Sequence, residues 1–229
     1  MGAENPTNQY RQLSNTTDGD AGVEGVKTGT TLVGVVAEDR VVLASDRRAS
    51  LGGMVSSKDV RKVVSVADRA AMAFSGSMAG AQALTARLES QVRLYELRRG
   101  ERMSTGALAT ALSNLLRRES FQTAPLLAGV DADGPHLYDV DVGGSLLEGE
   151  YAAGGSGTPY VYGLLEAEYE PGLSAEAARE VAATAVAVAS ERDLASGNGL
   201  VVGEVSRDGV DVRTVDDPTG FGRGTDVAS

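Results

Sequence analysis

The chain has 229 residues, of which 42% are hydrophobic, enough for one domain with a large core or for two small ones. With 21 basic and 32 acidic residues its formal net charge is -11, which argues against nucleic acid as a partner. Cysteine is absent, and this excludes disulfides, thiolate metal sites and cysteine nucleophiles.

Lysine is scarce among the basic residues. Only Lys27, Lys58 and Lys62 are present. An acidic, lysine-poor surface is typical of proteins that stay soluble at high salt, because salt screens the repulsion between carboxylates. A GC-rich genome that favours arginine over lysine is the alternative. On either interpretation, a lysine kept inside a structured segment needs a reason.

The first 29 residues are polar, rich in Gly, Asn and Thr, and without apolar periodicity, which predicts a disordered leader. The segment lacks the basic-then-apolar order of a secretory signal. No run in the chain approaches the ~20 apolar residues that a membrane span needs. We therefore expect a cytoplasmic protein that does not associate with membranes.

The predicted structure starts abruptly after Gly29. Apolar and β-branched runs at 31–37 and 41–45, separated by three polar residues, predict a hairpin. Two more short strands are expected at 62–66 and 70–74, with a turn between them.

The apolar spacing then becomes helical. One helix is predicted between Ser77, an N-cap, and Gly100, a helix stop, and a second begins near Ser104. The remaining expected elements are strands at 124–130, 136–140, 145–147 and 151–153, a short helix ending near Glu166, an alanine-rich helix from Ser174 to about Asp193, strands at 200–205 and 210–214, and a loose tail.

Strands and helices therefore come in blocks. This order favours antiparallel sheets covered by helices over a parallel βαβ arrangement, so the expected class is α+β. Two sheets packed face to face and covered by helix pairs would bury all of these apolar faces. The sequence shows neither an internal repeat nor a linker.

The choice of catalytic base is narrow. The only histidine, His136, follows a turn, where a histidine is usually a surface or hydrogen-bonded structural residue. An α-amino group is another base suited to neutral pH, since its ordinary pKa is about 7.7–8.0. It would lie beside a hydroxyl if the chain were cut after Gly29, because Thr30 would then become the first residue. From these residues alone, a flexible leader that merely meets a first strand fits equally well.

Four segments carry a resemblance to a known family. They are GTTLVGVVAEDRVVLASDRRASLGGMVSSKDVRKV, FSGSMAGAQ, YAAGGSGTPYVYGLLE and ERDLASGNG. In this order, and over nearly all of residues 29–214, they closely resemble proteasome β subunits of archaeal type, and the composition suggests a haloarchaeal source. The resemblance implies an N-terminal-nucleophile hydrolase folded as a four-layer αββα sandwich. It implies a propeptide at 1–29 removed autocatalytically, a catalytic domain at 30–214 and a flexible tail at 215–229.

The resemblance also implies roles for individual residues. Thr30 matches the nucleophile, Asp46 the catalytic acid and Lys62 the catalytic lysine. The polar group that orients the N-terminus matches Ser156, Asp193 and Ser196, and the oxyanion-hole N–H matches Gly76. The family's substrate pocket maps to the apolar residues Ala49, Val60, Val64, Phe74 and Met78.

Each of these assignments has a simpler alternative. Asp46 fits a solvated turn, Lys62 fits a surface charge, and the pocket residues fit an ordinary core. The Gly-rich turn at 154–157 resembles a phosphate cradle, but it lacks the Gly-Lys-Ser/Thr of a P-loop. An apolar pocket suits cleavage after large hydrophobic residues, although Phe74 is bulkier than the aliphatic residue expected there.

The implied function is that of a threonine-type endopeptidase acting on unfolded polypeptides without a cofactor or metal. The implied partners are other β subunits in a heptameric ring, α subunits, and an ATPase that feeds substrate through the α rings. Two alternatives are a purely structural ring member and an N-terminal-nucleophile amidase acting on small amides. Inactive ring members usually lose the Gly-Thr junction or the lysine, and both are present here.

Overall fold

The computed structural model of the chain describes residues 29–51 and 53–216. The predicted leader, apart from Gly29, and the predicted tail, apart from residues 215 and 216, lie outside the described residues. The strands are β1 (Thr31–Val36), β2 (Arg40–Asp46), β3 (Ala49–Leu51), β4 (Met54–Ser57), β5 (Val63–Ala67), β6 (Ala70–Gly76), β7 (Thr123–Val130), β8 (Pro135–Val140), β9 (Leu146–Glu148), β10 (Tyr151–Gly155), β11 (Leu200–Ser206) and β12 (Gly209–Val215). The helices are α1 (Met78–Arg99), α2 (Thr105–Arg118), α3 (Thr158–Glu168) and α4 (Ala175–Arg192).

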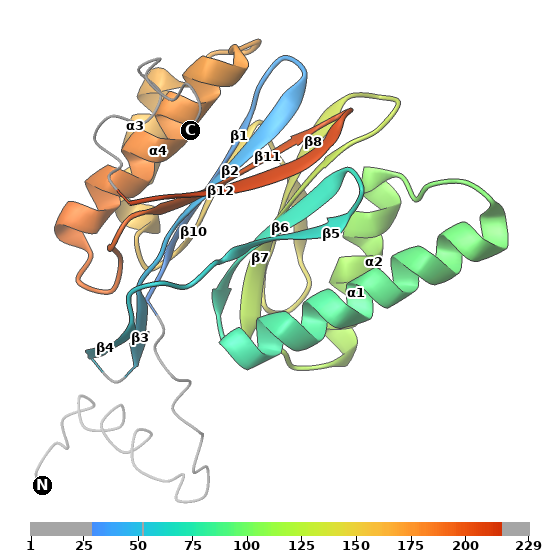
Figure 1. Ribbon diagram of the computed structural model, residues 1–229, viewed down its shortest axis with the longest axis horizontal. Coiled ribbons are helices and arrows are strands. Elements are labelled where there is room, and N and C mark those ends of the chain that lie inside the picture. The colour runs from blue at the N-terminus through green and yellow to red at the C-terminus, as the bar shows by residue number, and fades with distance from the viewer. Residues whose placement is uncertain (1–28, 52, 217–229) are drawn as a thin grey trace, which may run out of the picture.

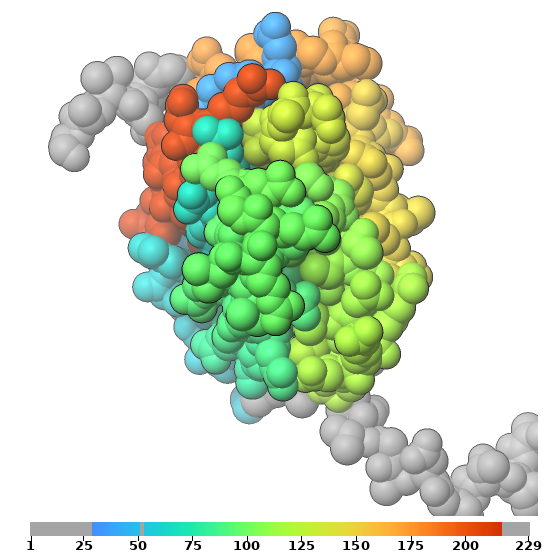
Figure 2. All heavy atoms as spheres, turned by 90° about the vertical axis from the view of Figure 1, so that its right-hand side faces the viewer, coloured from blue at the N-terminus to red at the C-terminus, as the bar shows by residue number. Residues whose placement is uncertain are grey.

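Ten of these strands form two antiparallel sheets. One has the order β10-β1-β2-β11-β12, and the other has the order β5-β6-β7-β8-β9. Helices α3 and α4 cover the outer face of the first sheet, and α1 and α2 cover the outer face of the second (Figure 1). The space-filling view from the side of α1 and α2 shows these two helices lying over the second sheet (Figure 2). The predicted α+β class and αββα layering are confirmed.

The apolar residues of the first strand divide between two cores. Leu32 packs between the two sheets, whereas the next residue, Val33, packs under α3 and α4. Successive side chains of a strand point to opposite faces, so a strand buried on both faces is apolar throughout. A third core, which contains Met72 and Phe74, fills the space between the second sheet and helices α1 and α2.

The predicted helix starts are correct. The hydroxyls of Ser77, Ser104 and Ser174 each accept a backbone N–H in the first turn of α1, α2 and α4. Helix α4 ends at Arg192, in agreement with the predicted end near Asp193. Residues 193–199 form a loop, here called the 193–199 loop, that leads back to the start of β1 and into β11.

A small hairpin, β3–β4, was not expected from the sequence. Its strands have three and four residues, and residues 53–56 are exposed. Strands this short lack the apolar alternation on which strand prediction depends. The hairpin lies at the end of the sandwich where β1 begins (Figure 1).

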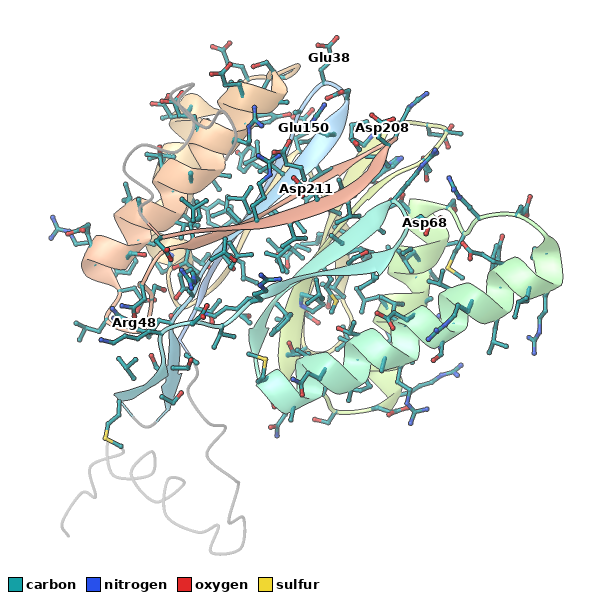
Figure 3. The ribbon with its side chains drawn as sticks, viewed as in Figure 1. Glu38, Arg48, Asp68, Glu150, Asp208 and Asp211 are labelled. Atoms are coloured by element: carbon teal, nitrogen blue, oxygen red, sulfur yellow. The ribbon has the colours of Figure 1, made fainter. Side chains whose placement is uncertain are left out.

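The opposite end of the sandwich presents acidic turns. Glu38, in the β1–β2 turn, and Asp208, in the β11–β12 turn, are exposed there, far from Arg48 (Figure 3). The acidic balance of the chain is thus carried in part by its turns.

Glu204 on β11 anchors α4 and the neighbouring strands to one another. Its carboxylate is 6% exposed, and it accepts hydrogen bonds at 3.1 Å from Arg40 and at 3.1 Å from Arg179, with Arg213 at 3.7 Å. Removing the carboxylate charge would leave the partly buried guanidinium groups of Arg40 and Arg179 without their shared counterion.

We therefore expect Glu204→Gln to lower the free energy of unfolding by about 2 kcal/mol, less than for a fully buried pair because the arginines keep some water. This corresponds to a melting temperature lowered by roughly 4–8 °C for a chain of this size. Thermal unfolding of the variant checks the loss. Glu180→Gln, at an exposed position beside Arg179, is the matched control and should melt with the parent.

Candidate active site

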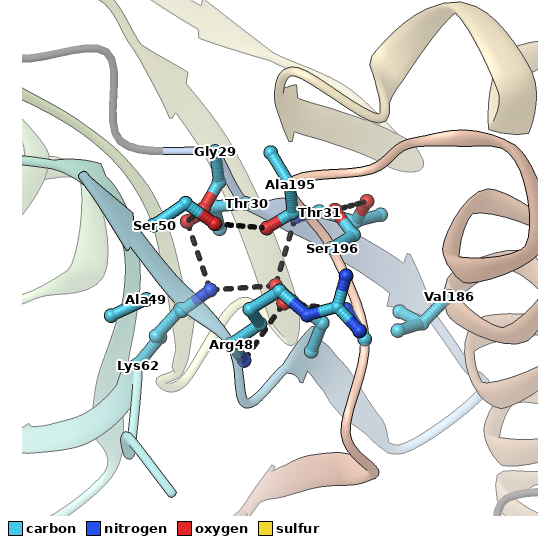
Figure 4. Close-up of polar contacts among 12 residues, drawn as sticks. Gly29, Thr30, Thr31, Arg48, Ala49, Ser50, Lys62, Val186, Ala195 and Ser196 are labelled. Carbon is cyan, nitrogen blue, oxygen red and sulfur yellow. Dashed lines mark hydrogen bonds and ion pairs between the residues drawn. The ribbon is translucent and has the colours of Figure 1, made fainter. Parts of the chain in front are cut away.

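Thr30 lies buried immediately before β1, at the end of the first sheet, and it is 3% exposed. Strand β10, the start of β3 and the 193–199 loop surround it (Figure 4). Gly29 is still joined to Thr30, so the structure describes the uncut form of this junction.

The hydroxyl of Thr30 has two close partners. Its Oγ1 donates to the carbonyl oxygen of Gly29 at 2.7 Å and accepts from Nζ of Lys62 at 2.9 Å. The hydroxyl therefore lies next to the carbonyl of the peptide bond that precedes it and next to a cation. A cation at this distance stabilises negative charge that develops on the oxygen.

Lys62 is held at this place by Asp46. Both side chains are buried, and Nζ lies 2.7 Å from Oδ1 of Asp46. Burial lowers the pKa of Lys62 below its ordinary value, and the opposite charge of Asp46 limits that fall. The Lys62 side chain is therefore buried, paired with a carboxylate and hydrogen-bonded to the Thr30 hydroxyl.

Backbone donors fix Asp46 in turn. Its Oδ1 also accepts the N–H of Thr31, and its Oδ2 accepts the N–H groups of Arg48 and Gly197, each at 3.0 Å. The pairing of β11 with β2, which places Leu200 opposite Asp46, brings Gly197 within reach. Asp46 therefore has a full set of donors in addition to the lysine.

A second polar group contacts the nitrogen of Thr30. The Thr30 N–H donates to Ser156 Oγ at 3.1 Å, and the hydroxyls of Ser156 and Ser196 donate to Asp193 Oδ2 at 2.6 and 2.7 Å. Burial alone would raise the pKa of Asp193, but these hydroxyls and the N–H of Ala195 hold it below its usual value. Asp193 is therefore an ionised carboxylate that organises the hydroxyls around the Thr30 nitrogen.

Thr31 has contacts that the sequence analysis did not foresee. Its Oγ1 lies 2.7 Å from Ser196 Oγ, while its N–H is bonded to Asp46. The Thr-Thr pair at the Gly29 junction was the available signal, since neighbouring strand residues face opposite ways.

A cavity of about 150 Å³ opens beside Thr30. Its lining residues are Gly29, Thr30, Ala49, Ser50, Ser56, Lys62, Phe74, Gly76 and Met78. Three of the five predicted pocket residues are therefore among them, together with the polar residues Ser50 and Ser56.

The other two predicted pocket residues are not at this cavity. Val64 packs against the core under α1 and α2, because it alternates with Val63, which faces the other sheet. Val60 lies in the loop before β5, where its N–H donates to the carbonyl of Arg47. Of the predicted pocket residues, Ala49, Phe74 and Met78 therefore line this cavity, and the assignment of all five to the substrate pocket stays a prediction.

Gly76 requires glycine for two reasons. Its φ is +100°, a region that favours glycine, and a Cβ there would lie 2.3 Å from the carbonyl oxygen of Gln122. This conformation brings the end of β6 to the cavity next to Thr30 and to the first turn of α1.

His136 is engaged elsewhere. Its ring nitrogens contact Glu148 at 2.7 Å and Asp131 at 3.2 Å, so it is a hydrogen-bonded residue between two carboxylates and has no contact with Thr30. No group of three or more His, Asp or Glu side chains in the described part of the chain is placed to hold a metal ion. Nor does any described helix combine the length and apolar composition needed to cross a bilayer.

Two antiparallel sheets between helix pairs, with a threonine hydroxyl and a lysine at one sheet end, define an N-terminal-nucleophile hydrolase sandwich. A family model described as "Proteasome subunit" matches residues 26–205. A proteasome subunit beta of Haloferax volcanii is 51% identical over 195 residues, covering 85% of this chain and 80% of its own. One of Halorhabdus utahensis is 49% identical, covering 88% and 87%. The "Proteasome subunit beta 2" of Haloarcula marismortui is 46% identical, covering 84% of each chain.

The chain belongs to the proteasome β-subunit family, a family of threonine-type endopeptidases and components of a proteolytic core. Its relatives come from haloarchaea, in agreement with the acidic, lysine-poor composition.

Proposed function

We propose that the chain cuts itself between Gly29 and Thr30 and then hydrolyses unfolded polypeptides with the Thr30 hydroxyl as nucleophile. The observation that carries this proposal is the position of Thr30 Oγ1, which lies between the Gly29 carbonyl oxygen at 2.7 Å and the Lys62 ammonium at 2.9 Å. A purely structural ring member has no use for a buried ammonium at this hydroxyl.

Self-cleavage follows from this placement. Thr30 Oγ loses its proton and attacks the carbonyl carbon of Gly29, forming a five-membered ring with the Thr30 nitrogen. The C–N bond then breaks, the nitrogen takes a proton, and an ester joins Gly29 to Thr30 Oγ. Water hydrolyses the ester, which releases the Gly29 carboxyl group and leaves Thr30 with a free α-amino group.

The free amine then supplies the base for other substrates. It takes the proton of Thr30 Oγ as the oxygen attacks a substrate carbonyl, and it returns a proton to the leaving amine. We assign the backbone N–H of Gly76 to the oxyanion that forms, a contact typically worth about 3 kcal/mol. Asp46 balances the charge of Lys62, and the group of Ser156, Asp193 and Ser196 orients the amine. Water finally hydrolyses the acyl ester.

The cavity supports cleavage after large hydrophobic residues. Phe74 and Met78 offer apolar walls next to Thr30, and Ala49 in the same lining is small. Ser50 and Ser56 make part of the wall polar, so we expect a preference for hydrophobic residues that is not absolute.

We further propose that the subunit forms heptameric rings, stacks against α-subunit rings and receives substrate from an ATPase in the cytoplasm. The names of the relatives support assembly with other proteasome subunits. Apolar side chains that are open to solvent in the isolated subunit also support it, since Leu94 and Leu97 on α1 are 50% and 82% exposed. Enclosing the site in such a particle would confine proteolysis to chains that enter it.

The intact mass of the subunit from the purified particle tests the function directly. We expect the mass of residues 30–229 and a free α-amine on Thr30, together with hydrolysis of peptides that carry a hydrophobic residue before the cut. A particle that hydrolyses peptides while its β subunits keep residues 1–29 would overturn the proposed mechanism.

Steric crowding at position 29, just before the proposed cut, favours glycine there. A Cβ on Gly29 would lie 1.6 Å from Cβ and 2.8 Å from Cα of Ala195, in the 193–199 loop. We expect Gly29→Ala to slow self-cleavage by about 100-fold, as for a reacting group displaced by about 1 Å. The rate of leader loss, followed by intact mass, checks this.

Removing the methyl group of Ala195 is the matched test. The double variant Gly29→Ala/Ala195→Gly should cleave faster than Gly29→Ala alone, because the closest overlap is gone and the contacts that remain are at 2.8 Å to Cα and 3.1 Å to the carbonyl carbon of residue 195. Gly163→Ala, at a helical glycine with open space around it, is the control and should process like the parent. Equal rates of leader loss for Gly29→Ala with and without Ala195→Gly would show that a clash with the Ala195 methyl group does not slow self-cleavage.

A further inference from the structure

The donor and the acceptor can be assigned in each hydrogen bond made by the hydroxyls around Asp193. Ser156 and Ser196 each have one hydroxyl hydrogen, and each points it at Oδ2 of the ionised Asp193. Ser196 Oγ therefore has no hydrogen left for Thr31, although the two oxygens lie only 2.7 Å apart. The Thr31 hydroxyl must be the donor in this contact, with Ser196 as the acceptor.

The environment of Thr31 leaves its hydroxyl little freedom. The residue is 0% exposed, and a Cβ on Gly157 would lie 1.8 Å from Thr31 Oγ1, so this oxygen packs against the Gly157 backbone. The N–H of Gly157 in turn donates to the carbonyl of Thr30. The hydroxyl thus occupies a fitted position beside the turn that carries Ser156.

Thr31 also connects the two halves of the site. Its backbone N–H donates to Asp46, the counterion of Lys62, and its side chain donates to Ser196, the partner of Asp193. The sequence separations of these contacts are 15 and 165 residues. Thr31 therefore links the part of the site that holds Lys62 to the part that holds the Thr30 nitrogen.

We propose that Thr31 is a positioning residue for the reaction: its hydroxyl donates to Ser196 and thereby holds Asp193 and Ser156 where they orient the Thr30 nitrogen. This rests on the proposed function, in which that nitrogen is the base. Because Thr31 does not line the cavity, its hydroxyl acts on the rate of the chemical step and leaves substrate binding unchanged.

The test compares Thr31→Val, which keeps the shape and loses the hydroxyl, with Thr31→Ser, which keeps the hydroxyl. Both are produced with the α subunit as assembled particles, and kcat is expressed per subunit that has lost its leader by intact mass. We expect kcat of Thr31→Val to fall roughly tenfold with KM within about twofold of the parent. Thr31→Ser should stay close to the parent.

A pH profile separates positioning from loosened packing. Without the Thr31 donor, Ser196 is a weaker donor to Asp193, and the carboxylate takes up a proton at higher pH. The acidic limb of kcat/KM should therefore move to higher pH by about half a unit in Thr31→Val. Ser196→Ala, which removes the acceptor and leaves Thr31 in place, should reproduce both changes, and it serves if Thr31→Val does not assemble.

Three results would overturn the proposal: a parent-like kcat and pH profile in Thr31→Val, an equal loss in Thr31→Ser, or a parent-like Ser196→Ala. The failure of the proposed function is seen separately, as peptide hydrolysis by particles whose Thr30 has been replaced by alanine. An inactive Thr30 variant together with a parent-like Thr31→Val would contradict the role proposed for Thr31 and leave the proposed function intact.

Discussion

Thr30→Ala should yield a particle that keeps residues 1–29 on every β subunit and hydrolyses no peptide. Alanine removes the hydroxyl that contacts both the Gly29 carbonyl and Lys62. Both reactions depend on that oxygen, so self-cleavage and peptide hydrolysis should be lost in parallel. Intact mass measures the first and a fluorogenic peptide with a hydrophobic residue before the cut measures the second.

Thr30→Ser is the matched variant for this experiment, because it restores the hydroxyl without the methyl group. It should recover leader removal and a measurable part of the peptidase rate. Thr30→Ala particles that still lose residues 1–29, with no other protease present, would show that the hydroxyl is not the group that cuts the chain.

Lys62→Met should reduce peptide hydrolysis by about 10³-fold, the range expected when a group that assists proton transfer and charge stabilisation is removed. Methionine has a similar length and no charge, so Thr30 Oγ loses the donor at 2.9 Å. Asp46 keeps three backbone N–H donors, and for this reason we expect the variant to fold and assemble. The measurement is kcat/KM of the assembled particle, with circular dichroism as the check on folding.

Lys58→Met provides a control of the same chemistry. Lys58 is the other lysine within the described residues, and it is exposed in the segment that leads to Lys62. Its replacement removes one positive charge four residues away and should leave kcat/KM within about twofold of the parent. Comparable losses in both variants would mean that net charge, and not the buried ammonium, controls the rate.

Local signals explain why much of the fold could be predicted from the sequence. Helices α1, α2 and α4 begin where Ser77, Ser104 and Ser174 precede apolar residues at helical spacing, and each serine caps its own helix. Caps and periodicity act within a few residues, so a single sequence contains them. The β3–β4 hairpin carries no such signal, because strands of three and four residues are too short to show a pattern.

Long-range contacts explain what was missed at the site. The hydrogen bond between Thr31 and Ser196 joins residues 165 positions apart, and the Thr-Thr pair at the junction does not indicate which distant residue Thr31 contacts. Phe74 and Val64 were both assigned to the pocket, and of the two Phe74 lines the cavity beside Thr30 while Val64 packs under α1 and α2, because the face to which a strand residue points depends on its register. The assignments of Thr30, Asp46 and Lys62 came from the family resemblance, and their catalytic roles stay predictions that the variants above test.

The pairing of β11 with β2 sets a time at which the enzyme can first act. Asp46 and Ser156 are translated well before the 193–199 loop, yet Gly197 and Ser196 contact Asp46, Thr31 and Asp193 only after β11 has joined the sheet beside β2. A nascent chain still short of residue 200 therefore lacks a finished catalytic centre, and pairings between distant segments form slowly. If self-cleavage follows the proposed mechanism, it can therefore begin only in chains in which β11 has already paired with β2.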